Sequence, residues 1–567
     1  MSLLSSIPQR QLTSINNLLQ KSEEQNKAPP EDADIVAEEE LEAVNEAEED
    51  AEKVSEESLE EKAAEDESIP SSVISDSLDD TNGDDTDSSD TNGEDGNPSQ
   101  ASETESKKTT GESAFSSYSL LEALRKRRSR RFSTGIEIEG GPTAYTSDRD
   151  PQPLTETETA LLVFAACGIT GPPLLDWTYN EGEGGNMMAG LAGRTISSAD
   201  AVNSMAMFVI QDDATWLARR PQDIPADELV DIMRLIAEDE FVEAWRRMRV
   251  KVADERCALP VEPPYNINAN QWSLHAEGTT YFLPVSELTH LYINALFEFL
   301  REESGFYFVD ERRLYLPAGL SEFAKSNGGF LDDDPNNGKV MTINYIERLA
   351  GEASLIEQGM ALQNLGLACQ AMGLSGFPHF THHDEAWFEA LGFRMGEQPL
   401  TEFLSVPRIT AALLRLRGQN PEMSYPLGLE QNSEVLLKPF CPPYYDSMGD
   451  AVRAVYERKF GDDGIFRGGH DIVEESEVDT GWESPEEVTS DIPDIDESAI
   501  DATTAYCEYI HDRYGRFPAT YPPFHTFMGF QAGHIDEGFY EEYYRPGALT
   551  ESHRQHRDRW HDQYESS

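Results

Sequence analysis

Residues 359–376, GMALQNLGLACQAMGLSG, have almost no polar face if they form a helix. Only Gln363, Asn364 and Gln370 interrupt the run of apolar and small residues. Because these apolar residues are not confined to one stripe, such a helix is buried on nearly all sides. The pattern therefore predicts a central helix around which the rest of a domain packs.

Three glycines, Gly359, Gly366 and Gly373, recur about every two turns of this helix and fall close to one face. Since glycine has no Cβ atom, another helix or a flat ligand can approach the backbone closely there. The residues GLSG at 373–376 are expected to end the helix in a turn. The pattern fits both a core helix and a helix that lines a ligand site.

The chain of 567 residues carries a formal net charge of -63 at pH 7. Asp and Glu far outnumber Lys and Arg before residue 114, and large apolar residues are few there. Such a segment cannot bury enough surface to offset its ordering entropy. We predict a disordered acidic tail over residues 1–113. The acidity also disfavours nucleic acid and anionic membranes as partners, because phosphate binding requires the opposite charge.

The five cysteines form no CxxC pair and show no metal-ligand spacing. This usage indicates free thiols in a reducing compartment. The apolar runs are too short to span a bilayer, and the first residues lack the charged start and apolar core of a signal peptide. We therefore expect a cytoplasmic protein.

Helical and strand patterns follow one another without a regular β-α-β order. Helical spacing occurs at residues 119–126, 154–168, 227–250, 288–301, 359–376, 408–417 and 450–460. Strand patterns occur at residues 206–211, 281–283, 306–316, 425–429 and 435–440. This mixture predicts an α+β fold. We expect a main domain at residues 114–465, an acidic linker at 466–500, and a small C-terminal extension at 501–567 that is rich in aromatic residues and histidine.

A basic run, RKRRSRR at residues 125–131, stands out in this acidic chain. Guanidinium groups and a hydroxyl suit a phosphate group, and Arg127, Arg128, Ser129 and Arg131 supply them. A nucleic-acid or localisation patch and a solvated helix end are the alternative interpretations.

Three stretches, in this order, resemble the nitroreductase-like family of FMN flavoproteins, and they are most similar to its SagB-type dehydrogenase branch. The first is Arg127-Arg128-Ser129 with Arg131. The second comprises LLVFAACGITG at 161–171 and RTISSA at 194–199, and the third is QNLGLACQAMGL at 363–374. Residues 425–429 resemble the late strand of the family. The similarity spans about residues 119–461, with a long insertion at about 213–351.

The resemblance implies a nitroreductase-like antiparallel or mixed sheet flanked by helices, in a homodimer with FMN at its interface. It implies hydride transfer through flavin N5 from NAD(P)H to a small acceptor. The residues implied for FMN are Arg127, Arg128, Ser129 and Arg131 at the phosphate, and Arg194, Ser198, Asn203, Gly373, Ser375 and Gly376 around the ring. No catalytic side chain is named, because the cofactor carries the chemistry. The Lys-Tyr pair of the SagB-type branch is not placed here, which disfavours the peptide-modifying activity of that branch.

Histidines are dense near the C-terminus, namely His511, His525, His534, His553, His556 and His561. A zinc or iron site with Asp536 or Glu537 as a further ligand is one interpretation. Aromatic packing partners and surface histidines are the other, and we favour it, so the prediction includes no metal site. The sequence HHDE at 382–385 is interpreted in the same way.

Two further functions stay open at the level of sequence. One is a flavin-binding protein that has lost turnover, and the other is a scaffold whose acidic tail recruits basic partners. Bound flavin separates the oxidoreductase and the silent binder from the scaffold, because it colours a protein yellow.

Overall fold

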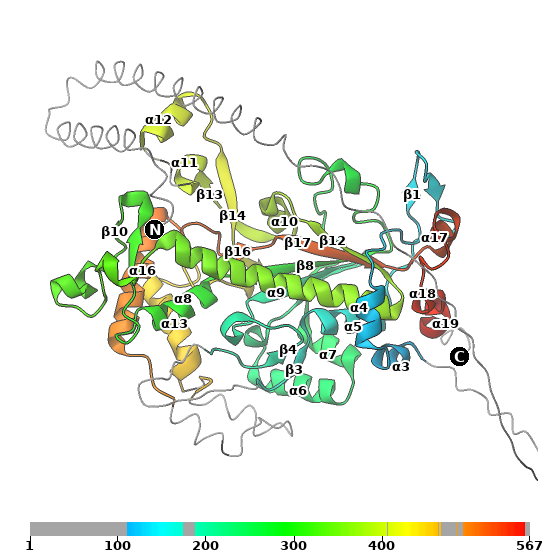
Figure 1. The fold of residues 1–567 in the computed structure, drawn as a ribbon, viewed down its shortest axis with the longest axis horizontal. Helices are drawn as coiled ribbons and strands as arrows, with labels where there is room; N and C mark the ends of the chain where they lie inside the picture. The colour runs from blue at the N-terminus through cyan, green and yellow to red at the C-terminus, as the bar shows by residue number, and fades with distance from the viewer. Residues whose placement is uncertain are drawn as a thin grey trace, which may run out of the picture. The chain divides into compact units, whose positions relative to one another are not determined.

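The computed structural model describes residues 110–173, 188–404, 406, 408–462, 464–466, 484 and 492–561. The chain is divided into two units, Met1–Glu103, which lies outside the described residues, and Thr104–Ser567. The acidic tail predicted for residues 1–113 and the linker predicted for 466–500 therefore lie mostly outside them. All elements below belong to the second unit (Figure 1).

A seven-stranded sheet with the order β12-β17-β8-β5-β6-β7 forms the centre of this unit, and β16 pairs with β8 beside β17. All of these pairings are antiparallel. The strands are β5 (Met205–Ile210), β6 (Thr215–Ala218), β7 (Arg249–Ala253), β8 (Thr280–Glu287), β12 (Ser375–Phe380), β16 (Phe524–His525) and β17 (Met528–Gly533).

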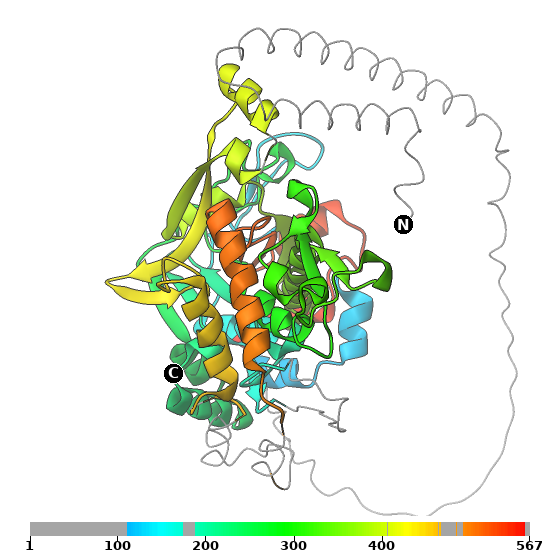
Figure 2. The ribbon, with the colours of Figure 1, turned by 90° about the vertical axis from the view of Figure 1, so that its left-hand side faces the viewer.

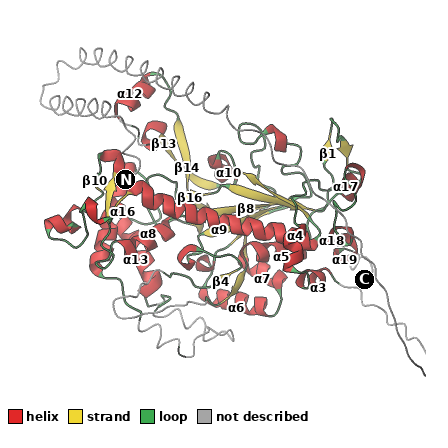
Figure 3. Ribbon diagram, viewed as in Figure 1, coloured by secondary structure: helices red, strands yellow, loops and turns green. Residues whose placement is uncertain are grey.

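Smaller sheets and many helices surround this sheet (Figure 3). The smaller sheets contain β1 (Glu137–Ile138), β2 (Tyr145–Thr146), β3 (Ile169–Gly171), β4 (Gly193–Arg194), β9 (Tyr307–Asp310), β10 (Leu316–Pro317), β11 (Val340–Thr342), β13 (Phe393–Pro399), β14 (Glu422–Gln431) and β15 (Glu434–Leu437). The helices before the longest one are α3 (Gly111–Ser116), α4 (Leu120–Lys126), α5 (Glu156–Cys167), α6 (Ala226–Ala237), α7 (Phe241–Met248) and α8 (Thr289–Phe299). The others are α9 (Ile343–Met372), α10 (Asp384–Ala390), α11 (Leu400–Phe403), α12 (Arg408–Leu416), α13 (Met448–Phe460), α16 (Glu497–Tyr514), α17 (Glu537–Tyr543), α18 (Glu551–Arg554) and α19 (His556–Trp560). Mixed helices and mainly antiparallel sheets confirm the α+β class.

Both faces of the central sheet are covered, as β5 illustrates. Met205, Met207 and Val209 of this strand join the core on the α9 side. The alternate residues, Ala206, Phe208 and Ile210, join a second core with α10, β13 and β14. Since successive side chains of a strand point to opposite faces, a strand covered on both sides reads as the continuous apolar run seen in the sequence.

The 30-residue helix α9 lies across one face of the sheet (Figure 1). Leu362, Leu365 and Cys369 of α9 share a core with α5, β5, β8 and β17. The helix ends at Gly373, whose φ of +87° favours glycine. It begins much earlier than the predicted segment, because Thr342 caps it by accepting a hydrogen bond from the backbone of Tyr345.

The C-terminal segment is an integral part of the domain, which differs from the predicted small extension. Strand β17 lies between β12 and β8 in the sheet. Helix α16 packs beside α13 and α8 around a separate core (Figure 2). The segment predicted as an insertion supplies β8, which is also internal to the sheet. The sheet is therefore complete only when segments from distant parts of the chain pair with one another.

The predicted helix at residues 227–250 is two helices, α6 and α7, separated at Asp239, whose φ is +60°. All five cysteines are free, as predicted. Within the described residues, no helix has both the length and the hydropathy needed to cross a membrane.

Candidate functional site

The first and third motifs lie side by side at the C-terminal end of α9. The backbone of Gly376 donates to the carbonyl oxygen of Arg130 at 2.9 Å. The hydroxyls of Ser133 and Ser375 are hydrogen-bonded at 2.6 Å. Arg127 lies against α9, where a Cβ added to Gly366 would be 3.4 Å from its Cδ. The extended chain after α4 is thereby fixed to the start of β12.

Three residues of the predicted phosphate site are accessible. Arg128 and Ser129 are exposed and Arg127 is partly exposed. Arg128 donates to the backbone carbonyls of Arg127 and Arg125, at 2.7 and 3.4 Å. Among the described residues, none of the three side chains pairs with a carboxylate. Two guanidinium groups and a hydroxyl are therefore available to an anion here.

The next two arginines are bound into the protein. Arg130 is 5% exposed and donates to the Gln370 side chain at 3.0 Å and to the carbonyl of Ala548 at 3.0 Å. Arg131 donates to Asn270 at 2.8 Å and Ser273 at 3.0 Å. Burial lowers the pKa of both guanidinium groups.

The guanidinium of Arg131 also lies 4.9 Å from the ring centre of Trp272 and 4.8 Å from that of Phe377. Since stacked aromatic rings and hydrogen bonds already hold it, its structural role differs from the predicted phosphate contact. Arg130, the arginine that the motif leaves out, is the most buried one of the run. A residue in the middle of a charged run gives no sequence signal of burial.

Of the predicted ring contacts, Arg194 and Ser198 bind Glu357 of α9, and Asn203 bonds carbonyls of the neighbouring loop. Arg194 forms an ion pair with Glu357 and donates to the carbonyls of Cys167 and Met205, at 3.1 and 3.0 Å. The Ser198 hydroxyl donates to Glu357 at 3.2 Å and accepts from the backbone of Asn203 at 2.8 Å. The Asn203 amide donates to the carbonyl of Ala201 at 3.0 Å. Arg194 and Ser198 therefore fix the segment before β5 to α9.

Gly373, Ser375 and Gly376 are enclosed by protein. A Cβ on Gly373 would lie 2.2 Å from the carbonyl oxygen of Ser552, and one on Gly376 would lie 2.7 Å from the Phe530 ring. Ser375 is 2% exposed. The C-terminal strand β17 and helix α18 thus occupy the space that the prediction gave to a ring face.

A groove of about 280 Å³ lies along the second half of α9. Its lining combines residues of α3, α4, α5 and the 194–196 segment with α9, namely Phe115, Tyr118, Leu120, Ala123, Ala165, Thr195, Asn364, Leu367, Ala368 and Ala371. The buried hydroxyls of Thr195 and Tyr118 have no hydrogen-bond partner. The Asn364 amide donates to the carbonyls of Ala165 and Thr195, at 3.0 and 3.1 Å. Asn364, Leu367 and Ala368 belong to the third motif and Thr195 to the second, and α4, which supplies Leu120 and Ala123, leads into the first.

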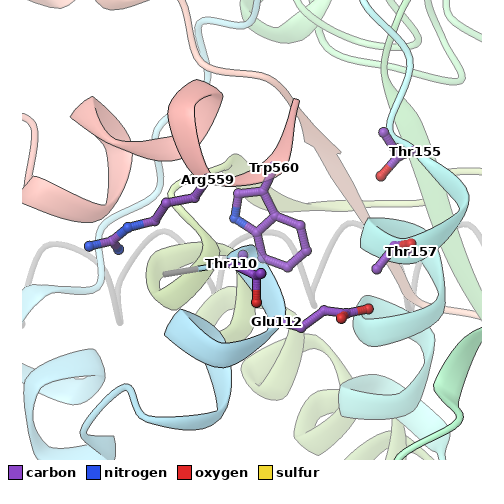
Figure 4. Close-up of a pocket in the computed structure, with 7 residues that line it drawn as sticks. Thr110, Glu112, Thr155, Thr157, Arg559 and Trp560 are labelled. Carbon is purple, nitrogen blue, oxygen red and sulfur yellow. The ribbon is translucent and has the colours of Figure 1, made fainter. Parts of the chain in front are cut away.

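A second cluster forms around Glu158 in the first turn of α5. His534, His556 and His561 converge on this carboxylate, rather than on the predicted Asp536 or Glu537. Trp560, which precedes His561, lies between the first turns of α3 and α5, beside Thr110, Glu112, Thr155 and Thr157 (Figure 4). Sequence reasoning singled out the histidines and missed Glu158, because 376 residues separate it from His534.

No protein-family model matches this sequence, and no curated protein matches it. Among solved structures, the chain is similar to a protein classed as a nitroreductase from Ralstonia eutropha JMP134. The two share 11% sequence identity, and the match covers 49% of this chain and 77% of the other with a TM-score of 0.24. Since that similarity is low, the functional assignment rests on the residues of this chain.

Proposed function

We propose that this protein is an FMN-dependent oxidoreductase of nitroreductase type that takes hydride from NAD(P)H and passes it to a small acceptor. The observation that carries the proposal is the meeting of the second and third sequence motifs at one groove along α9, with α4, which leads into the first motif, as a further wall. Motifs that are distant in the chain and meet around a concave surface are typical of a ligand site.

The groove supports a flat, mainly apolar ligand with a few polar edges. Its walls are mostly apolar, and the unpartnered hydroxyls of Thr195 and Tyr118 can each bond an edge atom of a ring. Unsatisfied buried hydroxyls are costly, so a ligand that bonds them gains affinity. These features suit an isoalloxazine ring.

The accessible residues Arg127, Arg128 and Ser129 would hold the phosphate of FMN near Gly366. Guanidinium groups bind phosphate oxygens through charge-assisted hydrogen bonds, and Ser129 adds a neutral donor. Seven of the ten predicted contacts are enclosed or paired within the protein, so the proposed site keeps only these three and adds Tyr118, Thr195 and Asn364. Bound FMN would supply hydride transfer through N5.

A second copy of the chain would cover the groove. Tyr345, Leu349 and Ile356 are 47%, 45% and 63% exposed, and they share one face of α9 with Leu367 of the groove. On α4, Leu120, Leu121 and Leu124 are 67%, 64% and 53% exposed. Exposed apolar residues that continue along two packed helices mark an interaction surface. A homodimer would bury them and exclude water from the ligand.

The test is a titration of the full-length protein with FMN, followed by flavin fluorescence and by the melting temperature. The matched variant is Ala371→Phe, because Ala371 is a small residue of the groove wall and a phenyl ring would fill the groove. The proposal expects saturable binding to the wild type and loss of at least about tenfold in affinity for the variant. Equal affinity of the two proteins would refute the groove as the site.

A further inference from the structure

Three imidazole rings meet at one oxygen of a buried carboxylate. The Nε2 atoms of His534, His556 and His561 lie 3.2, 3.0 and 3.6 Å from Oε1 of Glu158. The Glu158 residue is 0% exposed, and the potential ligand atoms all lie within 4.8 Å of one another. The four residues come from the first turn of α5, the residue after β17, the start of α19 and the residue after α19.

The tautomers of two rings are set by backbone carbonyls. Nδ1 of His534 lies 2.9 Å from the carbonyl oxygen of Gln152, and Nδ1 of His556 lies 2.8 Å from that of Met372. A carbonyl only accepts, so each Nδ1 carries the proton and a neutral ring presents its lone pair at Nε2. These lone pairs face a carboxylate oxygen. Acceptors this close repel one another unless a cation or additional protons lie between them.

Protonation of the imidazole rings could remove this repulsion, but it would be energetically costly. It would place two imidazolium ions beside a third histidine in a buried site that contains one carboxylate. The other oxygen of Glu158 already accepts from the backbone and the hydroxyl of Thr155, at 2.7 and 2.9 Å. One carboxylate oxygen and three neutral imidazoles are instead a common ligand set for a divalent transition metal.

The distances fit a tetrahedral ion. With metal–ligand distances of about 2.0–2.1 Å, the corners of a tetrahedron are about 3.3 Å apart, and the centres of three bound imidazole rings are about 5.2 Å apart. The distances from Nε2 to Oε1 are 3.0 to 3.6 Å. The ring centres are 5.2 Å apart for His534 and His556, 4.9 Å for His534 and His561, and 5.4 Å for His556 and His561.

We propose that Glu158, His534, His556 and His561 form a binding site for a divalent transition metal ion, with Zn²⁺ as the best fit to its tetrahedral geometry. The carbonyls of Gln152 and Met372 orient two ligands, and Thr155 orients the carboxylate, as outer-shell partners do in metal sites. The ring of His556 also stacks on Trp560, with 6.1 Å between centres.

The bound ion would fasten the C-terminal helix α19 to α5 and to the end of β17. A cavity of about 50 Å³ borders all three rings, together with Arg149 and Glu537. This space admits a water molecule next to the ion. The site is separate from the groove along α9 and does not depend on flavin binding.

The probe for the test is Co²⁺, added to full-length protein after treatment with a chelator. Tetrahedral Co²⁺ with nitrogen ligands absorbs strongly in the visible range, whereas octahedral Co²⁺ bound only by oxygen absorbs weakly. This contrast separates the proposed site from adventitious binding by the 107 acidic residues of the chain. We expect one strongly absorbing Co²⁺ per chain, its displacement by Zn²⁺, and a higher melting temperature with either ion.

The deciding variant is His561→Gln, because His561 is 18% exposed at the side chain and its replacement should leave the fold intact. We expect it to bind metal at least about 100-fold more weakly and to lose the strong absorption. Glu158→Gln should behave likewise. The matched control is His383→Gln, since His383 is a half-exposed histidine outside the cluster and should bind as the wild type does. A weak octahedral spectrum for the wild type, or an unchanged spectrum for His561→Gln, would overturn the proposal.

Discussion

Arg194 and Glu357 form an ion pair in the interior, with 3.8 Å between Nη1 of the arginine and Oε1 of the glutamate. Their side chains are 1% and 3% exposed. Glu357 also accepts from the hydroxyls of Ser204 and Ser198, at 2.6 and 3.2 Å. The pair joins β4 to the middle of α9, so Arg194 and Ser198 of the second motif serve the architecture around the groove rather than the ligand itself.

Glu357→Gln should lower the free energy of unfolding by about 3–5 kcal/mol, because it leaves the Arg194 guanidinium buried without its carboxylate. The double variant Arg194→Met with Glu357→Leu should lose less, since it removes both charges. Urea unfolding of the three proteins checks this. If Glu357→Gln lowered the free energy of unfolding by less than about 1 kcal/mol, the ion pair would not be important for stability.

Arg127→Ala and Arg128→Ala should each weaken FMN binding by about tenfold or more, because each removes a charge-assisted hydrogen bond to phosphate. Neither should change the melting temperature without FMN, since both side chains reach solvent. Arg125→Ala is the control, because Arg125 is an exposed arginine that precedes the motif. An equal effect of Arg125→Ala would indicate general electrostatic attraction instead.

Ile356→Glu and Leu120→Glu should convert the proposed dimer into a monomer, because each places a charge within a buried apolar contact. Leu416→Glu should leave the assembly unchanged, since Leu416 is 85% exposed on α12, away from α4 and α9. Light scattering after size exclusion gives the mass of each protein. A wild type that is monomeric at micromolar concentration would contradict the dimer.

His379 should make the protein sensitive to acid. Burial lowers the pKa of this histidine from 6.5 to about 4. Between these two pH values the histidine is protonated in the unfolded chain and neutral in the folded chain. Its contribution is fully present above pH 6.5 and is lost as the pH falls from 6.5 towards 4, by up to about 3 kcal/mol. His379→Phe should therefore flatten the decline in unfolding free energy between pH 7 and pH 4.5. A decline as steep as in the wild type would exclude His379 as its source.

Local patterns were sufficient to predict several elements of the domain. The apolar run at residues 206–211 is β5, and the helical spacing at 288–301 is α8. The first half of α9 was not predicted, because Glu347 and Glu357 are buried there while Tyr345, Leu349 and Ile356 are exposed. That arrangement inverts the usual relation between polarity and burial on which such a prediction depends.

The site was predictable only in part, because its remaining residues are defined by long-range contacts. The motif at 127–131 predicted accessible arginines but not that Arg130 would be buried against Gln370. Nothing in the sequence around Glu158 connects it to His534, His556 and His561. In the sequence, a glutamate three residues after Thr155 is already accounted for by its role in capping the start of α5. Only the pairing of β17 inside the sheet brings the C-terminal histidines to α5.

The proposed function depends most directly on turnover of bound flavin at the groove along α9. The most direct measurement is the visible absorption of the FMN-loaded full-length protein under anaerobic conditions, before and after NADH or NADPH is added. We predict one retained FMN per chain and bleaching of its absorption by at least one of the two nucleotides, with neither property in Ala371→Phe. Protein that stays colourless after incubation with FMN, or flavin that neither nucleotide bleaches, would contradict the account.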